Sequence, residues 1–183
     1  MRIIAGRAGR VAIKVPSAVA RPTTDFVRQA LFSILGETVH DARVLDLFAG
    51  SGALGLEALS RGAASCTFVD EHRQACAIIP ENLKKARLDA GRVVKSDVPT
   101  FLKRDTATYH LIFADPPYWK HAGDKDHIGH LLGQDLIAPR LTPGGLFLAE
   151  VSANQPSPDG APLTLADRRE YGSSAVVIYQ VGG

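Results

Sequence analysis

The stretch Val44–Gly62, which reads VLDLFAGSGALGLEALSRG, constrains the fold more than any other part of this chain. It begins with five mostly apolar residues, as expected of a strand that is buried on both faces. Gly50-Ser51-Gly52 then interrupts the apolar run, and a helical pattern follows. Glycine allows positive φ and brings main-chain N–H groups close to a ligand. The stretch therefore predicts a strand, a glycine turn and a helix that together bind a nucleotide-like ligand.

The glycines of this turn also match a dinucleotide-binding fingerprint. Gly50, Gly52 and Gly55 spell G-x-G-x-x-G, and Asp70 follows 20 residues after the first of them. In dinucleotide-binding enzymes an acidic residue at this spacing binds the ribose of NAD. An NAD-dependent oxidoreductase is therefore one hypothesis for this chain.

Predicted strands and helices alternate along most of the sequence. We expect an α/β fold with a doubly wound, mainly parallel sheet of seven strands, helices on both faces, and ligands at the carboxyl ends of the strands. Pro80 falls inside an apparent helix over 72–88, so we expect a break or restart there. The other expected helices span 25–35, 53–61, 98–104 and 127–137. The expected strands span 43–49, 65–70, 92–95, 110–114 and 145–151, with a closing antiparallel pair at 163–171 and 175–181.

Residues 1–36 precede this alternation. Apolar residues that alternate loosely between positions 1 and 15 predict a small β-hairpin, and Thr23 or Thr24 is the expected cap of a helix that starts near Asp25. We expect that helix to end at Gly36. Its expected buried stripe is Phe26, Val27, Ala30, Leu31, Ile34 and Leu35. The first 28 residues contain six basic residues and one acid, which indicates either a solvated surface or an arm that binds a phosphate backbone.

The composition argues against several classes of protein. The 183 residues suffice for one domain with its own core, and 45% hydrophobic with 22% charged residues is typical of a soluble globular protein. We expect neither a membrane span nor a signal peptide. Cys66 and Cys76 are expected to be core residues of a cytoplasmic protein, without a disulfide. The spacing of His121, His127 and His130 fits no standard zinc pattern, so no metal site is expected.

Four aspartates are expected to meet at one crevice. Asp46 lies within the first predicted strand, while Asp70, Asp97 and Asp115 lie at or near the ends of later strands. Because the carboxyl ends of parallel strands share one edge of a sheet, these side chains should converge there. Asp70 suits hydrogen bonds to ribose hydroxyls, and Asp97 suits an acceptor for the exocyclic amine of adenine.

The sequence Asp115-Pro116-Pro117-Tyr118 follows the fourth predicted strand directly. Two consecutive prolines remove two N–H donors and stiffen the backbone, so carbonyl groups are left to face the crevice. The aspartate adds another acceptor, and the tyrosine ring offers a face for stacking. Rigid acceptors beside a stacking ring suit a planar base whose amino group attacks an electrophile, because catalysis then needs only positioning and electrostatics.

These motifs resemble those of a known family. DPPY is the signature of the amino methyltransferases, and together with RPTTDFVRQALFSIL and LDLFAGSGALGLEALSRGA it resembles the RsmD family of small-subunit ribosomal RNA guanine-N2 methyltransferases. The resemblance covers nearly the whole chain and implies a Rossmann-like class I fold that binds S-adenosyl-L-methionine. It assigns the cofactor to Asp46, Phe48, Gly50, Gly52, Asp70, Asp97 and Asp115. It assigns catalysis to Asp115, Pro116, Pro117 and Tyr118.

The resemblance also implies a partner, 16S rRNA within the small ribosomal subunit or its assembly intermediate. Residues 1–36 would then be an RNA-facing extension, and residues 37–183 a methyltransferase domain, in a monomer. The expected RNA contacts are Arg7, Arg10, Arg21, Thr23, Thr24 and Arg28. The family usually has a basic residue at the position of Phe26 and Glu at that of Gln29, so this chain departs from the pattern in its presumed RNA-facing segment.

Other functions remain open at this point. DPPY motifs also serve enzymes that methylate adenine N6 or cytosine N4, in DNA or RNA. An NAD-dependent oxidoreductase would explain the glycines and Asp70 but gives the two prolines no role. A non-catalytic RNA-binding protein would explain the basic segment but not a crevice lined with carboxylates, because these repel phosphate.

Overall fold

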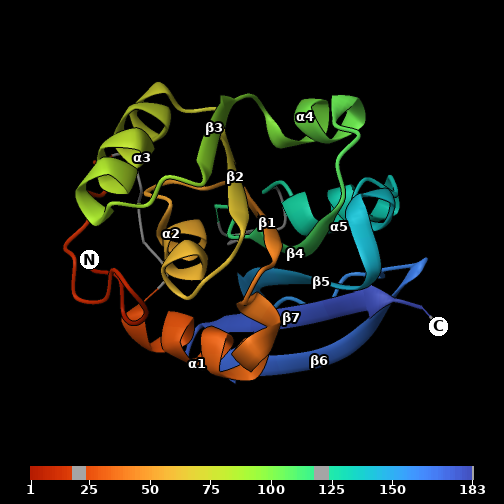
Figure 1. The fold of residues 1–183 in the computed structure, drawn as a ribbon. Coiled ribbons are helices and arrows are strands. Elements are labelled where there is room, and N and C mark those ends of the chain that lie inside the picture. The colour runs from red at the N-terminus through yellow and green to blue at the C-terminus, as the bar shows by residue number, and fades with distance from the viewer. Residues whose placement is uncertain (18–23, 118–123, 183) are drawn as a thin grey trace.

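The computed structural model describes residues 1–17, 24–117 and 124–182 (Figure 1). Three of the expected site residues, Arg21, Thr23 and Tyr118, lie outside this described part of the chain. His121 lies outside it as well.

A seven-stranded sheet forms the centre of the molecule, in the order β3-β2-β1-β4-β5-β7-β6. The first five strands of the sequence pair in parallel, and β7 pairs antiparallel with both β5 and β6. This arrangement confirms the expected fold class. The strands are β1 Arg43–Leu47, β2 Ser65–Asp70, β3 Gly91–Lys95, β4 Tyr109–Ala114, β5 Leu141–Ser152, β6 Leu163–Tyr171 and β7 Ser174–Val181.

Helices cover both faces of the sheet (Figure 1). The α-helices are α1 Asp25–Leu35, α2 Ala53–Ser60, α3 Arg73–Ala86, α4 Val98–Arg104 and α5 His127–Gly133, with short 3-10 helices at Gly36–Val39 and Ala138–Arg140. Apolar residues of α1, α2 and α3 share one buried cluster with one face of the sheet. Those of α4 and α5 share a second cluster with the other face. Among the described residues, no helix is both long and apolar enough to cross a membrane.

The expected break at Pro80 is wrong, because α3 continues through it as one helix. Proline removes one N–H donor and crowds the preceding turn, which destabilises a helix without necessarily ending it. Ile79 and Leu83, on either side of Pro80, are both buried against the rest of the molecule. This packing holds the two halves of α3 in line, so tertiary contacts override the local preference.

Helix α5 is shorter than expected, since it ends at Gly133 and not at Ile137. Asp135 has φ of 50°, a left-handed conformation that does not continue an α-helix. The apolar residues beyond it are still buried, with Ile137 fully shielded from solvent. The apolar pattern alone suggests helix here, although the chain reaches the core in an irregular turn.

The segment over residues 1–15 is fixed to the body of the molecule. It doubles back with one isolated antiparallel bridge, Arg2↔Ala12, so the expected hairpin exists only in this reduced form. Glu57 of α2 is fully buried and accepts hydrogen bonds from the backbone N–H groups of Ile4 (2.7 Å) and Ala5 (3.0 Å). Ser60 Oγ accepts another from Ala8 N (2.9 Å). The segment is therefore held by α2 and is not a free arm.

Helix α1 starts and ends as expected. Thr24 Oγ1 caps it by accepting a hydrogen bond from Val27 N (3.2 Å), and Gly36 follows its last residue with φ of 50°. Val27, Leu31 and Leu35 are buried as expected. Phe26 is not, because its side chain lies outside the buried stripe and is 68% exposed.

Candidate active site

The glycine turn after β1 connects the sheet to α2 through left-handed backbone. Phe48 has φ of 57°, Gly50 of 55° and Gly52 of 78°. A Cβ atom at Gly52 would also lie 3.2 Å from the Phe68 ring. Gly52 is therefore required by its backbone conformation and by packing. The turn carries the backbone across the carboxyl edge of β1, where a ligand of an α/β sheet binds.

Asp70, the last residue of β2, holds the glycine turn in place. Its Oδ2 accepts a hydrogen bond from Gly50 N (2.8 Å), and its Oδ1 accepts one from His72 N (2.8 Å). Each carboxylate oxygen has a second acceptor position beyond the one used here. Asp70 thus organises the turn and keeps capacity to accept from ribose hydroxyls.

Asp46 places a buried carboxylate beneath the same turn. Its Oδ2 accepts a hydrogen bond from Gly55 N (2.9 Å), which joins β1 to the first turn of α2. Burial raises the pKa of Asp46 well above its usual value; the Gly55 hydrogen bond opposes this, and the charges of Asp115 and Asp70 add to it. These three carboxylates therefore share one electrostatic environment. Such a crevice suits a ligand with positive charge, as S-adenosylmethionine has at its sulfonium and ammonium groups.

Asp97 lies at the same edge, next to β2. Ser96 N donates to Asp70 O (3.0 Å), which brings the β3–α4 turn beside the end of β2. The Asp97 side chain is exposed and caps α4 by accepting from Thr100 N (3.0 Å), and these hydrogen bonds lower its pKa. Its position is compatible with an adenine contact, while its present hydrogen bond is a helix cap.

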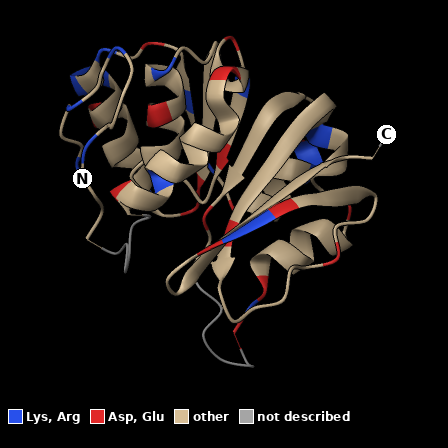
Figure 2. Ribbon diagram, turned by 90° about the horizontal axis from the view of Figure 1, so that it is seen from below, with Lys and Arg blue, Asp and Glu red and all other residues tan. Residues whose placement is uncertain are grey.

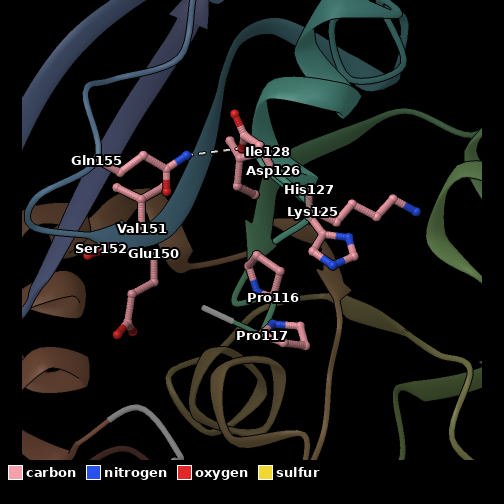
Figure 3. A pocket seen from close by; sticks show the side chains of 10 residues that line it. All are labelled: Pro116, Pro117, Lys125, Asp126, His127, Ile128, Glu150, Val151, Ser152 and Gln155. Carbon is pink, nitrogen blue, oxygen red and sulfur yellow. Dashed lines mark hydrogen bonds between the residues drawn. The ribbon is translucent and has the colours of Figure 1, made fainter. Parts of the chain in front are cut away.

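Asp115, Pro116 and Pro117 follow β4 at the centre of this edge. Asp115 is half-buried, Pro116 is buried and Pro117 is exposed. The two prolines line a recess together with residues from the start of α5 and the end of β5 (Figure 3). Gln155 Nε2 donates to Asp126 Oδ1 (3.0 Å) across this recess, which ties the loop after β5 to the start of α5. The recess lies where a substrate would meet the Asp-Pro-Pro segment.

Glu150 is a candidate site residue that the sequence motifs did not reveal. It lines the same recess, and 7% of its surface is exposed. Ala114 of β4 pairs with Ala149 of β5, so Asp115 and Glu150 follow at the next step of two neighbouring strands. Figure 3 shows its side chain extending from β5 away from Gln155, on the side where Pro117 lies. The available signal was an acid inside an apolar strand, GLFLAEV.

The expected RNA-binding residues have different surroundings. Arg28 is fully buried, and its Nη2 donates to Asp25 Oδ1 (2.6 Å) and Arg2 O (2.8 Å). The prediction that Arg28 contacts RNA is therefore wrong, because solvent does not reach it. Arg7 and Arg10 are exposed, as an RNA contact requires. Arg7 N donates to Ser60 O (2.8 Å), so this segment lies at the far end of α2 from the glycine turn.

Helix α2 has eight residues, so the distance from the turn to that end is about 12 Å. Figure 2 shows basic positions along the N-terminal segment, at the end of the molecule marked N. Within residues 1–17, 24–117 and 124–182, no group of three or more His, Cys, Asp or Glu side chains is arranged to hold a metal ion.

The strand order, the glycine turn and the acidic edge define the class of the protein, the Rossmann-like α/β fold of S-adenosylmethionine-dependent methyltransferases. A family model described as "Conserved hypothetical protein 95" matches residues 1–180. The chain therefore belongs to this family, which is the RsmD family.

Relatives with names are found in several bacteria. "Ribosomal RNA small subunit methyltransferase D" of Escherichia coli K12 is 42% identical over 119 residues, which cover 64% of this chain and 60% of that protein. The protein of the same name in Haemophilus influenzae is 32% identical over 98% of this chain and 93% of its own length. The match thus spans less than two thirds of the first relative and nearly all of the second.

Two solved structures are similar over almost their whole length. The yhhF protein of Escherichia coli has a TM-score of 0.83 and 35% identity, with 99% of this chain and 97% of that chain covered. The hypothetical protein TTHA0928 of Thermus thermophilus has a TM-score of 0.82 and 34% identity, with 99% of each chain covered. The N-terminal segment and the β6–β7 hairpin are included in these matches.

Proposed function

We propose that the protein transfers a methyl group from S-adenosyl-L-methionine to the exocyclic N2 amine of a guanine in 16S rRNA. The observation that carries this proposal is the position of Asp115-Pro116-Pro117, at the end of β4 and within electrostatic reach of Asp46. An acceptor-rich segment there can bind an amine while the neighbouring crevice binds the methyl donor. The relatives named "Ribosomal RNA small subunit methyltransferase D" support ribosomal RNA as the substrate.

The crevice supplies acceptors for both ends of the cofactor. We assign the methionine end to the glycine turn, to Phe48 and to the acidic environment of Asp46, the ribose to Asp70 and the adenine to Asp97. The first turn of α2 directs its partial positive charge toward the region that would hold the methionine carboxylate. When bound, S-adenosylmethionine supplies an electrophilic methyl carbon on a sulfonium.

The protein then acts by positioning and electrostatics. The target guanine, turned out of its stack, donates hydrogen bonds from its amine to the Asp115 carboxylate and the Pro116 carbonyl, with Tyr118 as the stacking ring. These bonds aim the nitrogen lone pair at the methyl carbon. The N–C bond forms as the S–C bond breaks, and positive charge moves from sulfur to nitrogen. Asp115 stabilises that charge until the extra proton leaves to solvent.

Glu150 favours guanine over the other bases that amino methyltransferases modify. In guanine the amine is next to the N1–H donor, whereas in adenine and cytosine it is next to a ring nitrogen that only accepts. Neighbouring strands lie about 4.8 Å apart, so Asp115 and Glu150 offer adjacent acceptors at their ends. Two adjacent acceptors match the two donors of guanine and repel the lone pair of adenine N1 or cytosine N3.

Labelled S-adenosylmethionine and undermethylated small ribosomal subunits test this proposal. We expect label in N2-methylguanine, no transfer by Asp115→Ala, and binding of S-adenosylhomocysteine by that variant close to that of the unaltered protein. Asp89→Ala, a change of the same kind at an exposed site before β3, should keep full activity. Label in methyladenine or methylcytosine would move the enzyme to another branch of the class. Thermal stabilisation by NAD in preference to S-adenosylhomocysteine would revive the oxidoreductase hypothesis.

The base is tested separately with Glu150→Gln. In a target that carries 2-aminopurine in place of guanine, N1 is an acceptor and the amine is retained. The unaltered protein should methylate guanine at least ten times faster than 2-aminopurine. The amide of Glu150→Gln can donate to N1, so this ratio should fall at least tenfold in the variant. An unchanged ratio would remove Glu150 from base recognition and leave methyl transfer itself unaffected.

A further inference from the structure

Phe26 is the most exposed large hydrophobic side chain among the described residues, with 68% of its surface accessible. It lies in the first turn of α1, and its ring contacts that of Tyr171, the last residue of β6. The ring centroids are 5.9 Å apart and the planes are inclined by 78°, an edge-to-face arrangement. This contact orients the Phe26 ring while most of its surface faces solvent.

The ring pair lies at the same edge of the sheet as the candidate active site. Tyr171 pairs with Ser174 across the β6–β7 turn, and Ser174 pairs with Ser152 of β5. Ala153 N donates to Ser173 O (2.9 Å), which fastens this turn to the end of β5. Ser152 lines the recess that contains Pro116 and Pro117. A continuous surface therefore leads from the recess over the turn to the two rings.

The basic side chains next to Phe26 are directed to a neighbouring acid. Arg28 is buried and bonded to Asp25, and Arg2 Nε lies 3.6 Å from the same carboxylate. A phosphate at this point would also approach the carboxylates of the crevice. The aromatic ring is thus the feature at the start of α1 that is best suited to bind nucleic acid.

We propose that Phe26, held by Tyr171, is a stacking platform for an unpaired nucleotide next to the target base in the substrate RNA. This inference rests on the proposed function. Sequence-specific RNA recognition relies on unstacked bases that lie against aromatic side chains, and such stacking works with any base. Once the target guanine is turned into the recess, its neighbour loses a stacking partner, and the Phe26 ring replaces that partner.

An interface with another protein fits these observations less well. The other large exposed hydrophobic side chains of the described residues are Leu165 and Val181. The register places them toward the other end of the β6–β7 hairpin, where Leu163 pairs with Val181. No apolar patch of the described residues therefore joins them to Phe26, and a single ring pair suits a base better than a protein surface.

Steady-state methylation of undermethylated small ribosomal subunits by Phe26→Ala, Phe26→Trp and Leu165→Ala tests this platform. Phe26→Ala should raise KM for the subunits between about fivefold and one hundredfold, with little change in kcat. Phe26→Trp should restore the original KM, and Leu165→Ala should not change it. Melting temperature and affinity for S-adenosylhomocysteine should be the same in all of these variants.

An unchanged KM in Phe26→Ala, or an equal rise in Leu165→Ala, would overturn the platform and leave the proposed function intact. If the unaltered protein does not methylate the subunits, the proposed function fails, and retention of the subunits on filters still tests the platform. A change of sedimentation mass in Phe26→Ala would assign the ring pair to self-association and would also overturn it.

Discussion

At the scale of single residues, Asp46 shows how a functional site opposes stability. Its carboxylate is buried, and the charges of Asp115 and Asp70 act on it together with the desolvation. Its pKa in the folded protein lies above its value in the unfolded chain. The unfolded chain therefore releases this proton at lower pH, and ionisation of Asp46 lowers the free energy of unfolding as pH rises from about 4 through the folded pKa.

We therefore expect Asp46→Asn to be more stable than the unaltered protein at pH 8. The amide oxygen can still accept from Gly55 N, while the buried charge is gone. Each 1 kcal/mol of added stability raises the melting temperature by about 2–4 °C in a chain of this size. The gain should vanish near pH 4, where the aspartate is itself neutral. Calorimetry at both pH values measures it, and a gain that grows toward low pH would contradict this account.

The same variant should bind S-adenosylhomocysteine more weakly, because the crevice loses the charge that suits a cationic amino group. A more stable protein with a weaker ligand site is the expected result when a charge is retained for function. Full affinity together with higher stability would mean that Asp46 serves only to join β1 to α2.

At the scale of elements, Glu57 connects the N-terminal segment to α2. Besides Ile4 N and Ala5 N, it accepts a hydrogen bond from Arg61 Nε (2.7 Å), and the Arg61 guanidinium lies 4.9 Å from the centroid of the Phe32 ring of α1. One buried carboxylate thus couples α2 to the first residues and, through Arg61, to α1. The three elements should lose stability together when it is removed.

We expect Glu57→Ala to lower the free energy of unfolding by about 3 kcal/mol, because it leaves backbone donors and an arginine without their acceptor. Hydrogen exchange at Ile4 and Ala5 should accelerate. Glu81→Ala removes an acid that pairs with Lys14 at the surface, and it should cost less than about 1 kcal/mol. Equal losses in the two variants would show that Glu57 is not a specific anchor.

Most elements were predictable from sequence because their patterns depend on local periodicity. The apolar runs of β1, β2 and β4 and the cap and glycine of α1 gave their bounds to within two residues. Helix α3 was different, since only the packing of Ile79 and Leu83 shows that it continues through Pro80. Arg28 and Phe26 were assigned to the wrong environments, because an arginine in a helix is buried only when its partners, here Asp25 and Arg2, come from the fold.

The candidate site was predictable where a motif lies in one stretch of sequence, as in the glycine turn and Asp115-Pro116-Pro117. Glu150 lacks such a motif, and its importance depends on the pairing of Ala114 with Ala149. That register is a long-range property of the sheet. The ring contact of Phe26 with Tyr171 joins positions 26 and 171, so it also depends on the assembled fold.

At the scale of the whole molecule, charge is separated from chemistry. The carboxylates gather at the crevice, while Arg7 and Arg10 lie exposed near the far end of α2. RNA affinity should then come from contacts outside the crevice, with the target base alone reaching into it. The division into residues 1–36 and 37–183 stays a functional prediction, because Ile3, Ala8 and Ile13 share one buried cluster with α2 and α3.

We expect the double variant Arg7→Ala and Arg10→Ala to bind small ribosomal subunits less tightly and with a weaker dependence on salt. Two lost phosphate contacts should reduce the slope of log K against log salt concentration by about 1.4 to 1.8. Lys103→Ala with Arg104→Ala removes the same charge from α4, on the other face of the sheet, and should change the slope little. Equal changes in both double variants would indicate an effect of net charge alone.

The glycine pattern of the sequence has one further consequence. A Cβ atom at Gly55 would overlap the Phe68 ring of β2, so this glycine sets how closely α2 approaches the sheet. It is a spacer between two layers, and no ligand is needed to explain it. A pattern search that scores G-x-G-x-x-G therefore reports in part an interlayer distance, and dehydrogenases and methyltransferases can satisfy it for the same mechanical reason. Ligand identity is encoded elsewhere, in the segments after β2 and β4, and those are the positions at which two such enzymes should be told apart.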